Sequence, residues 1–147
     1  MEVVGAAASI IQLASVGLTL AKTLYSICDE VASGNKQVKE LSFFVRSTSI
    51  ALEEVGKIFE EESRKTKPLI SKNAATTAND VIFRCTDVFN ELGKMAENRQ
   101  KNKLSQLTFS LKSSRRQDLQ ARLEQSKVDL QLMLQVIIYA QLKAEPR

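Results

Sequence analysis

The chain has 147 residues, enough for one domain with a single hydrophobic core. It contains no histidine and only two cysteines, Cys28 and Cys85, which excludes histidine-based acid–base chemistry and a zinc site built from paired cysteines. The net charge of +4 is concentrated in the last third, where residues 99–147 carry ten basic and four acidic side chains. Both cysteines are interpreted as small buried hydrophobes in a reducing compartment. Five glycines, two prolines and 44% hydrophobic residues are typical of an all-α protein with few turns.

The first predicted helix covers residues 2–33 and opens with an uncharged stretch, VVGAAASIIQLASVGLTLA, at residues 3–21. Its apolar residues repeat at alternating spacings of three and four on two adjacent stripes, beside a narrow polar seam that includes Thr19. Such a helix lies either among other helices or in lipid, and about twenty apolar residues are enough to span a bilayer. Its small residues favour a buried bundle helix in the resting state, although Gly17 and Ala21 also have the spacing of helix contacts in membranes.

The same helix is the candidate membrane element. A secretory signal is not expected here, because the first charged residue is Glu2 and not a basic side chain. If the helix enters a membrane, the residues expected to insert are the large apolar ones of its two stripes: Val3, Val4, Ile10, Ile11, Leu13, Leu18 and Leu20.

Two amphipathic helices are predicted next, over residues 36–65 and 69–98, each with one apolar face and one charged face. Pro68 is expected to stop the earlier of the two and to start the later one. The acidic triplet at residues 60–62 could be a metal or partner site, but it is interpreted as a solvated helix end.

Residues 99–113 are predicted to form a basic loop. Six cations occur between residues 99 and 116 with no acidic residue among them: Arg99, Lys101, Lys103, Lys112, Arg115 and Arg116. Two interpretations stay open, a solvated loop pinned to the bundle by its apolar residues and a surface that binds phosphate groups through charge. Anionic lipid is the expected ligand, and nucleic acid is not, because the segment holds a single aromatic residue for base stacking.

The last predicted helix covers residues 114–144. From Leu130 to Leu142 it is apolar except for three glutamines, so this half is expected to fill the centre of the bundle. Four helices with short connections predict an antiparallel four-helix bundle of nearly aligned helices with a shallow left-handed twist. The 3–4 spacing in the four segments predicts that the following residues are buried: Val4, Ile11, Leu18, Leu52, Phe59, Val88, Leu130 and Ile137.

Three stretches of the chain resemble a known family. They are MEVVGAAASIIQLASVGLTLAKTLYSI at residues 1–27, VKELSFFVRSTSIALEEVGKIF at 38–59 and SRRQDLQARLEQSKVDLQLMLQVIIYAQLK at 114–143. Together they are similar to the N-terminal domains of fungal STAND proteins, which belong to the HeLo-like group of signalling domains. The resemblance covers nearly the whole chain and rests on sequence pattern, not on an invariant catalytic motif.

The resemblance implies a single helical domain, residues 1–147, at the front of a nucleotide-binding immune receptor or beside an amyloid-forming motif. Better-known members execute programmed cell death in heterokaryon incompatibility by attacking the plasma membrane. We therefore expect a cytoplasmic protein that self-associates and reaches anionic membrane lipids when activated, with a receptor or further domains following Arg147. This chain departs from the full pattern in having no P-loop, no repeats and no amyloid motif.

Two other functions are open at this stage. The first is a soluble homotypic adaptor that recruits partners through its helix faces without any membrane activity. The second is an enzyme, which is not expected, because the Asp, Glu, Lys and Cys residues show no clustering in the sequence and no catalytic motif occurs. No cofactor is expected either.

Overall fold

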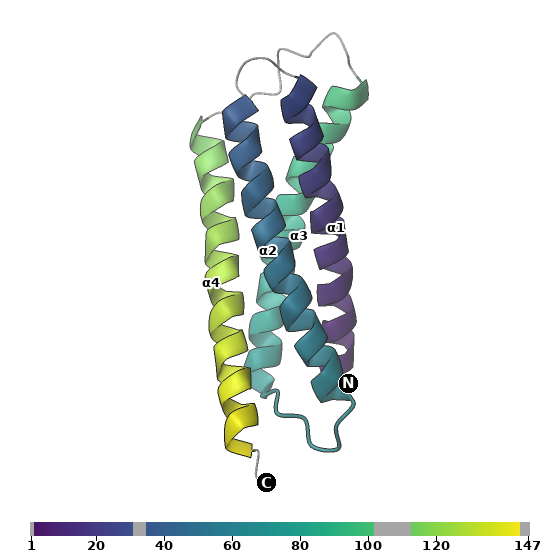
Figure 1. The fold of residues 1–147 in the computed structure, drawn as a ribbon, viewed down its shortest axis with the longest axis vertical. Coiled ribbons are helices and arrows are strands. Elements are labelled where there is room, and N and C mark those ends of the chain that lie inside the picture. The colour runs from purple at the N-terminus through teal and green to yellow at the C-terminus, as the bar shows by residue number, and fades with distance from the viewer. Residues whose placement is uncertain (1, 31–34, 102–112, 145–147) are drawn as a thin grey trace.

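The computed structural model describes residues 2–30, 35–101 and 113–144, and the side chains of residues 5–27, 36–97 and 114–144. Its helices are α1 (Glu2–Glu30), α2 (Asn35–Ser63), α3 (Lys72–Lys101) and α4 (Ser113–Ala144). They run up and down in turn along one long axis, nearly aligned (Figure 1). The predicted all-α four-helix bundle with a long apolar first helix is therefore confirmed.

The helices lie at the four corners of the bundle. α1 packs most extensively on α2 and also contacts α3, whereas α4 packs on α2 and α3. α1 and α4 are therefore at opposite corners, as their separation in Figure 1 shows. Each of these two helices has two packed neighbours, which leaves part of its circumference open to solvent.

The core contains the predicted residues of the later helices, because Leu52, Phe59, Val88, Leu130 and Ile137 are all buried. In α1 the prediction chose the less buried stripe. Ile11 and Leu18 are only half-buried, and Val4 lies outside the described side chains. The stripe that faces the core consists of Ala6, Ile10, Leu13, Gly17, Leu20, Leu24 and Ile27. Since both stripes are apolar, only the position of the neighbouring helices could decide between them.

Two glycines set the spacing between α1 and α2. A Cβ atom added at Gly17 would lie 2.7 Å from Phe89 Cε2 on α3 and closer still to Ser49 Oγ on α2. A Cβ atom added at Gly56 of α2 would lie 2.7 Å from Ile11 Cγ1. Real Cβ atoms do not make contacts this short, so these glycines allow the helix backbones to approach more closely than alanine would.

The connection between α2 and α3 differs from the predicted one. The Ser71 hydroxyl oxygen accepts a hydrogen bond of 3.1 Å from the Ala74 amide, and the Ser71 carbonyl accepts one of 3.0 Å from the Ala75 amide. Ser71 is therefore the N-cap, and α3 begins at Lys72. Pro68 does not start the helix as predicted, since it lies in the connection three residues before a side chain that can satisfy the free amides.

The acidic triplet is not wholly a solvated helix end. Glu60 and Glu61 are exposed, but Glu62 is completely buried. Its carboxylate accepts hydrogen bonds from Lys65 Nζ at 2.5 Å, from the Leu69 amide at 2.7 Å and from Gln141 Nε2 at 2.8 Å. The prediction is wrong for Glu62, whose side chain ties the end of α2 to the following connection and to α4.

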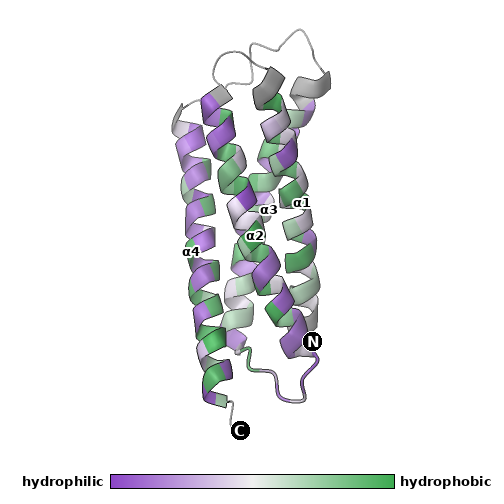
Figure 2. Ribbon diagram, viewed as in Figure 1, coloured by the Kyte–Doolittle hydropathy of each residue, from purple (hydrophilic) through white to green (hydrophobic). Residues whose placement is uncertain are grey.

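The C-terminal half of α4 does not fill the centre of the bundle, so this prediction is also wrong. Leu130, Met133 and Ile137 face the core, but six apolar residues of the same half point to solvent with exposed fractions of 39–67%: Val128, Leu132, Val136, Ile138, Tyr139 and Leu142. Figure 2 shows hydrophobic residues along α4 toward its C-terminal end. The physical reason is that this half of α4 carries apolar residues around most of its circumference, whereas α4 packs only on α2 and α3.

Candidate functional site

The first candidate site is α1 itself. Within the described helices, the segment Gly5–Ile27 is long and apolar enough to cross a membrane, with a mean hydropathy of 1.4. The core helix of a soluble protein meets the same criterion, so the finding shows capacity only. Of the residues predicted to insert, Ile10, Leu13 and Leu20 are buried in the core, Ile11 and Leu18 are half-buried, and Val3 and Val4 lie outside the described side chains.

This placement restricts how α1 could reach lipid. Because Ile10, Leu13 and Leu20 pack in the core, the helix cannot insert while the bundle is closed. α1 presents to solvent four residues of the predicted polar seam, Ser9, Gln12, Thr19 and Ser26. The other exposed residues of its described side chains are Gly5, Ala8, Ser15, Val16, Lys22 and Tyr25. Any membrane activity of α1 therefore requires that the helix separates from α2 and α3 first.

The second candidate site is the predicted basic segment, of which only part is described. Arg99 and Lys101 belong to the last turn of α3, but their side chains lie outside the described set, and Lys103 and Lys112 lie outside the described residues altogether. Arg115 and Arg116 are in the first turn of α4 and are half-buried. Anionic lipid binding by these six residues remains a prediction.

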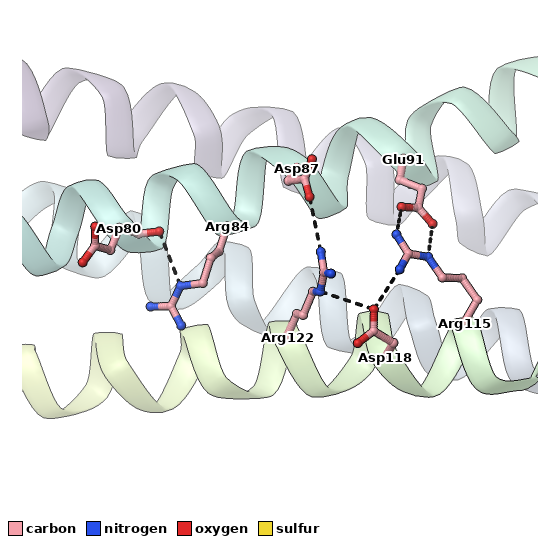
Figure 3. A network of polar contacts seen from close by, with 7 residues as sticks. All are labelled: Asp80, Arg84, Asp87, Glu91, Arg115, Asp118 and Arg122. Carbon is pink, nitrogen blue, oxygen red and sulfur yellow. Dashed lines mark hydrogen bonds and ion pairs between the residues drawn. The ribbon is translucent and has the colours of Figure 1, made fainter.

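Arg115 is engaged inside the bundle. Figure 3 shows its guanidinium against Glu91 of α3, with Nε donating to Glu91 Oε2 at 2.6 Å and a further contact to Glu91 Oε1. Asp118 of α4 accepts from the same guanidinium at 2.8 Å. The hydrogen bonds from Arg115 lower the pKa of Glu91, and the hydrogen bond to Glu91 raises the pKa of Arg115. Much of the Arg115 charge is therefore offset by two carboxylates of its own chain.

The ion pairs continue along the α3–α4 interface. Arg122 contacts Asp87 at 3.2 Å and Asp118 at 3.3 Å, and Arg84 contacts Asp129 at 2.6 Å. In Figure 3 the contacts that join the two helices run from Arg115 and Arg122 of α4 to Glu91 and Asp87 of α3. Each exposed ion pair of this kind contributes little to the stability of the fold, but several in a row fix the position of α4 against α3. This network has a structural function and is not a free basic surface.

A third candidate site is cationic and was not predicted. A groove of about 770 Å³ lies between α1 and α2, lined by Leu18, Ala21, Lys22, Tyr25, Ser26, Lys39, Ser42, Phe43 and Arg46. Lys39 Nζ lies 5.9 Å above the centre of the Tyr25 ring. Among the described side chains, no acidic one lines the groove, and none forms an ion pair with Lys22, Lys39 or Arg46. We refer to it below as the basic groove.

The basic groove lies at the end of the bundle where α3 ends and α4 begins (Figure 1). The predicted basic segment starts and finishes at this same end. Exposed Tyr25 and Phe43 line the groove together with the cations, and an amphipathic ring such as that of Tyr25 is favoured where protein meets a membrane interface. The sequence held no signal for this groove, because Lys22, Lys39 and Arg46 come together only when α1 and α2 pair in antiparallel fashion.

The remaining chemistry of the described residues is sparse. No group of three or more His, Cys, Asp or Glu side chains is placed to hold a metal ion within the described part of the chain. Cys85 is fully buried, and burial raises the pKa of its thiol to about 11. The thiol therefore stays protonated at neutral pH and is not a nucleophile, in agreement with its interpretation as a buried hydrophobe. The Cys28 side chain lies outside the described set.

Comparison with family models, curated proteins and solved structures finds no match.

Proposed function

We propose that this chain is a helical signalling domain that self-associates and, when activated, acts on membranes through α1. The observation that carries the proposal is an apolar helix of membrane-spanning length whose large side chains are partly buried in the bundle. The resemblance to HeLo-like domains supplies the context, which is regulated cell death of the heterokaryon-incompatibility type in a fungal immune-receptor protein. In this proposal the domain rests in the cytoplasm and moves to the plasma membrane on activation.

Activation has a simple physical form in this proposal. Release of α1 exposes the buried side chains of Ile10, Leu13 and Leu20 to water, which is unfavourable in free energy. Insertion into lipid returns the same side chains to an apolar environment. Self-association raises the local concentration of released helices, and the surface formed by Gly17 and Ala21 suits close helix contacts in the membrane. The basic groove would hold this end of the bundle against anionic headgroups while α1 is released.

Thr19→Lys tests membrane insertion of α1 without touching the core. Thr19 is exposed on α1, so a lysine there remains solvated in the closed bundle and the protein should fold normally. Near the middle of a membrane-spanning segment the same lysine costs about 2.5–3.5 kcal/mol on the insertion scale. We expect more than tenfold slower leakage from anionic vesicles and loss of toxicity in fungal cells.

Asn90→Lys, at an exposed site on α3, is the matched control and should behave as wild type in both assays. Circular dichroism and thermal unfolding establish that both variants are folded. A folded Thr19→Lys protein that causes leakage and kills cells as fast as wild type would falsify insertion of α1.

Charge reversal in the basic groove tests its contact with anionic lipid. Each cation near an anionic membrane contributes about 1 kcal/mol, so replacing Lys22, Lys39 and Arg46 by Glu should weaken vesicle binding on the order of 100-fold. The matched control reverses three exposed lysines near the other end of the bundle, Lys57, Lys67 and Lys72, with the same change in net charge. Co-sedimentation with phosphatidylserine vesicles measures both.

Equal loss of binding in both triple variants would show that net charge, and not the groove, attracts the membrane. Wild-type binding should also weaken as salt rises, since the proposed attraction is electrostatic. The groove is a better target than Arg115, because Arg115→Glu would also break the ion pairs with Glu91 and Asp118.

The alternative function is a soluble homotypic adaptor without membrane activity. One observation favours it specifically, the exposed apolar face of α4, because large apolar patches on soluble proteins commonly mark protein–protein contacts. The Thr19→Lys test separates the two functions, since an adaptor would retain its partner binding and show no leakage even as wild type.

A further inference from the structure

The exposed apolar face of α4 has a defined geometry. Its members lie on the side of the helix opposite Leu130, Met133 and Ile137, which face the core. They are Val128, Leu132, Val136, Ile138, Tyr139 and Leu142, and we call this set the outer face of α4. Val128, Leu132, Gln135, Tyr139 and Leu142 alternate in steps of four and three, which is the seam of a helix that packs along another helix.

Charge is nearly absent from this part of α4. Between Val128 and Leu142 the only charged residue is Asp129, and its carboxylate is paired with Arg84 of the same bundle at 2.6 Å. The six side chains of the outer face expose on the order of 600 Å² of surface, the upper end of the largest apolar patches on ordinary monomers. A stable interface buries roughly 800 Å² per partner. The flanking glutamines and the aliphatic part of Lys143 add to the area of the outer face, so that the total approaches this value.

The order of residues along the outer face is symmetric about position 137. Leu132 and Leu142 lie five residues to either side, Gln135 and Tyr139 two residues, and Val136 and Ile138 one residue. A two-fold axis at this level pairs an antiparallel copy of α4 with itself, so the same patch is used twice. Leu132 then lies opposite Leu142 of the second copy, and the Gln135 amide lies opposite the Tyr139 hydroxyl of the second copy, which are hydrogen-bonding groups of complementary kinds.

The edges of this arrangement fit as well. Val136 and Ile138 each meet their own counterpart close to the axis. Lys143 Nζ lies 5.4 Å above the centre of the Tyr139 ring. Lys143 is on the same side of the seam as Asp129, so the antiparallel pairing brings it close to Asp129 of the second copy. A parallel pairing would instead place Gln135 on Gln135 in the seam and Lys143 beside Lys143, and it gains nothing from the symmetric order.

We propose that the outer face of α4 is the self-association surface of this chain, and that its occupant is a second copy of α4 in antiparallel register about residue 137. The inference rests on the self-association in the proposed function and does not rest on its membrane step. A dimer formed through α4 leaves α1 at the opposite corner of the bundle, so membrane action and dimerisation can fail separately.

The first test is the oligomeric state of the full chain in solution. Sedimentation and light scattering of wild type should show a mass rising with concentration toward twice the 16.4 kDa chain mass. The double variant Val136→Glu with Ile138→Glu should remain at the chain mass, because it sets like charges against each other at the axis. The matched control is Phe83→Glu on α3, since Phe83 is more exposed than Val136 and Ile138 but lies on another helix. This variant should dimerise as wild type does.

The second test fixes the orientation by single cysteines in a Cys28→Ser background, where Cys85 is buried and unreactive. Val136→Cys should form a disulfide-linked dimer under mild oxidation. Leu132→Cys alone should not, because its counterpart lies about ten residues of helix rise, roughly 15 Å, away. Mixing Leu132→Cys chains with Leu142→Cys chains should restore cross-linking.

A wild-type chain that stays at the single-chain mass up to millimolar concentration would overturn the proposal. A dimer that survives the double glutamate change would overturn the choice of surface. Equal cross-linking by Leu132→Cys alone and by Val136→Cys would overturn the antiparallel register. Vesicle leakage with a monomeric wild type would refute the dimer and leave the membrane step of the proposed function standing.

Discussion

Replacing Phe59 by alanine is expected to lower the free energy of unfolding by about 3–5 kcal/mol, the usual cost for a core phenylalanine. Phe59 is the bulkiest of the fully buried side chains, with an exposed fraction of 0%, and it belongs to the core cluster formed by all four helices. The loss has two parts, the apolar surface no longer buried and the cavity that the close-packed neighbours fill only in part.

Phe83 of α3 provides the matched control, since it is the same residue type with an exposed fraction of 77%. Phe83→Ala should change the stability by no more than about 0.5 kcal/mol. Urea denaturation followed by circular dichroism measures both variants. Similar losses in the two would contradict the placement of Phe59 in the core.

Replacing Glu62 by alanine is expected to cost about 2–4 kcal/mol, because it removes three hydrogen bonds and leaves partly buried donors without an acceptor. The donors are the Leu69 amide and Gln141 Nε2, while Lys65 is half-exposed and returns to water. Glu61 is the matched control, since it is the adjacent residue and its own carboxylate is exposed. Glu61→Ala should therefore leave the stability nearly unchanged. A Glu62→Ala protein as stable as Glu61→Ala would show that the buried carboxylate does not hold α2 and α4 together.

The same side chain predicts a pH dependence. Burial alone raises the pKa of Glu62. The hydrogen bonds from Lys65, Gln141 and the Leu69 amide together lower it by more, so the pKa of Glu62 lies below its ordinary value of 4.5. The folded state thus favours the ionised form, and the stabilisation is complete above the unfolded pKa. It is lost as the pH falls through the lower, folded-state pKa. Thermal unfolding between pH 7 and pH 3 should show a shallower acid decline for Glu62→Gln than for wild type or Glu61→Gln.

The interior of the bundle could be predicted well where a helix has one apolar face. In α2 and α3 the 3–4 spacing leaves a single possible inward side, so Leu52, Phe59 and Val88 are buried as predicted. In α1 both stripes are apolar, and the structure buries the large side chains of the one with Ile10 and Leu13. In the other stripe Ile11 and Leu18 are half-buried, and the small residues Ala7, Ala14 and Ala21 are buried. Periodicity identifies apolar faces, but it cannot say which of two is covered.

The candidate sites could be predicted less well than the core, because they are formed by residues that are far apart in the sequence. The buried carboxylate of Glu62 is satisfied partly by Gln141, which lies 79 residues further along the chain. The basic groove unites Lys22 with Lys39 and Arg46 across the α1–α2 pair, and the charge of Arg115 is offset by Glu91 of another helix. None of these neighbours is set by local spacing.

The sequence by itself determined four helices, their up-and-down connection and the inward faces of α2 and α3, because each of these follows from a local pattern of apolar and polar residues. Only the tertiary structure decided that α1 and α4 occupy opposite corners, and with that which stripe of α1 is buried and that one apolar face of α4 remains open. The physical reason is that a helix's own residues specify which of its faces favour burial, whereas the number and position of its neighbours specify which of those faces are covered.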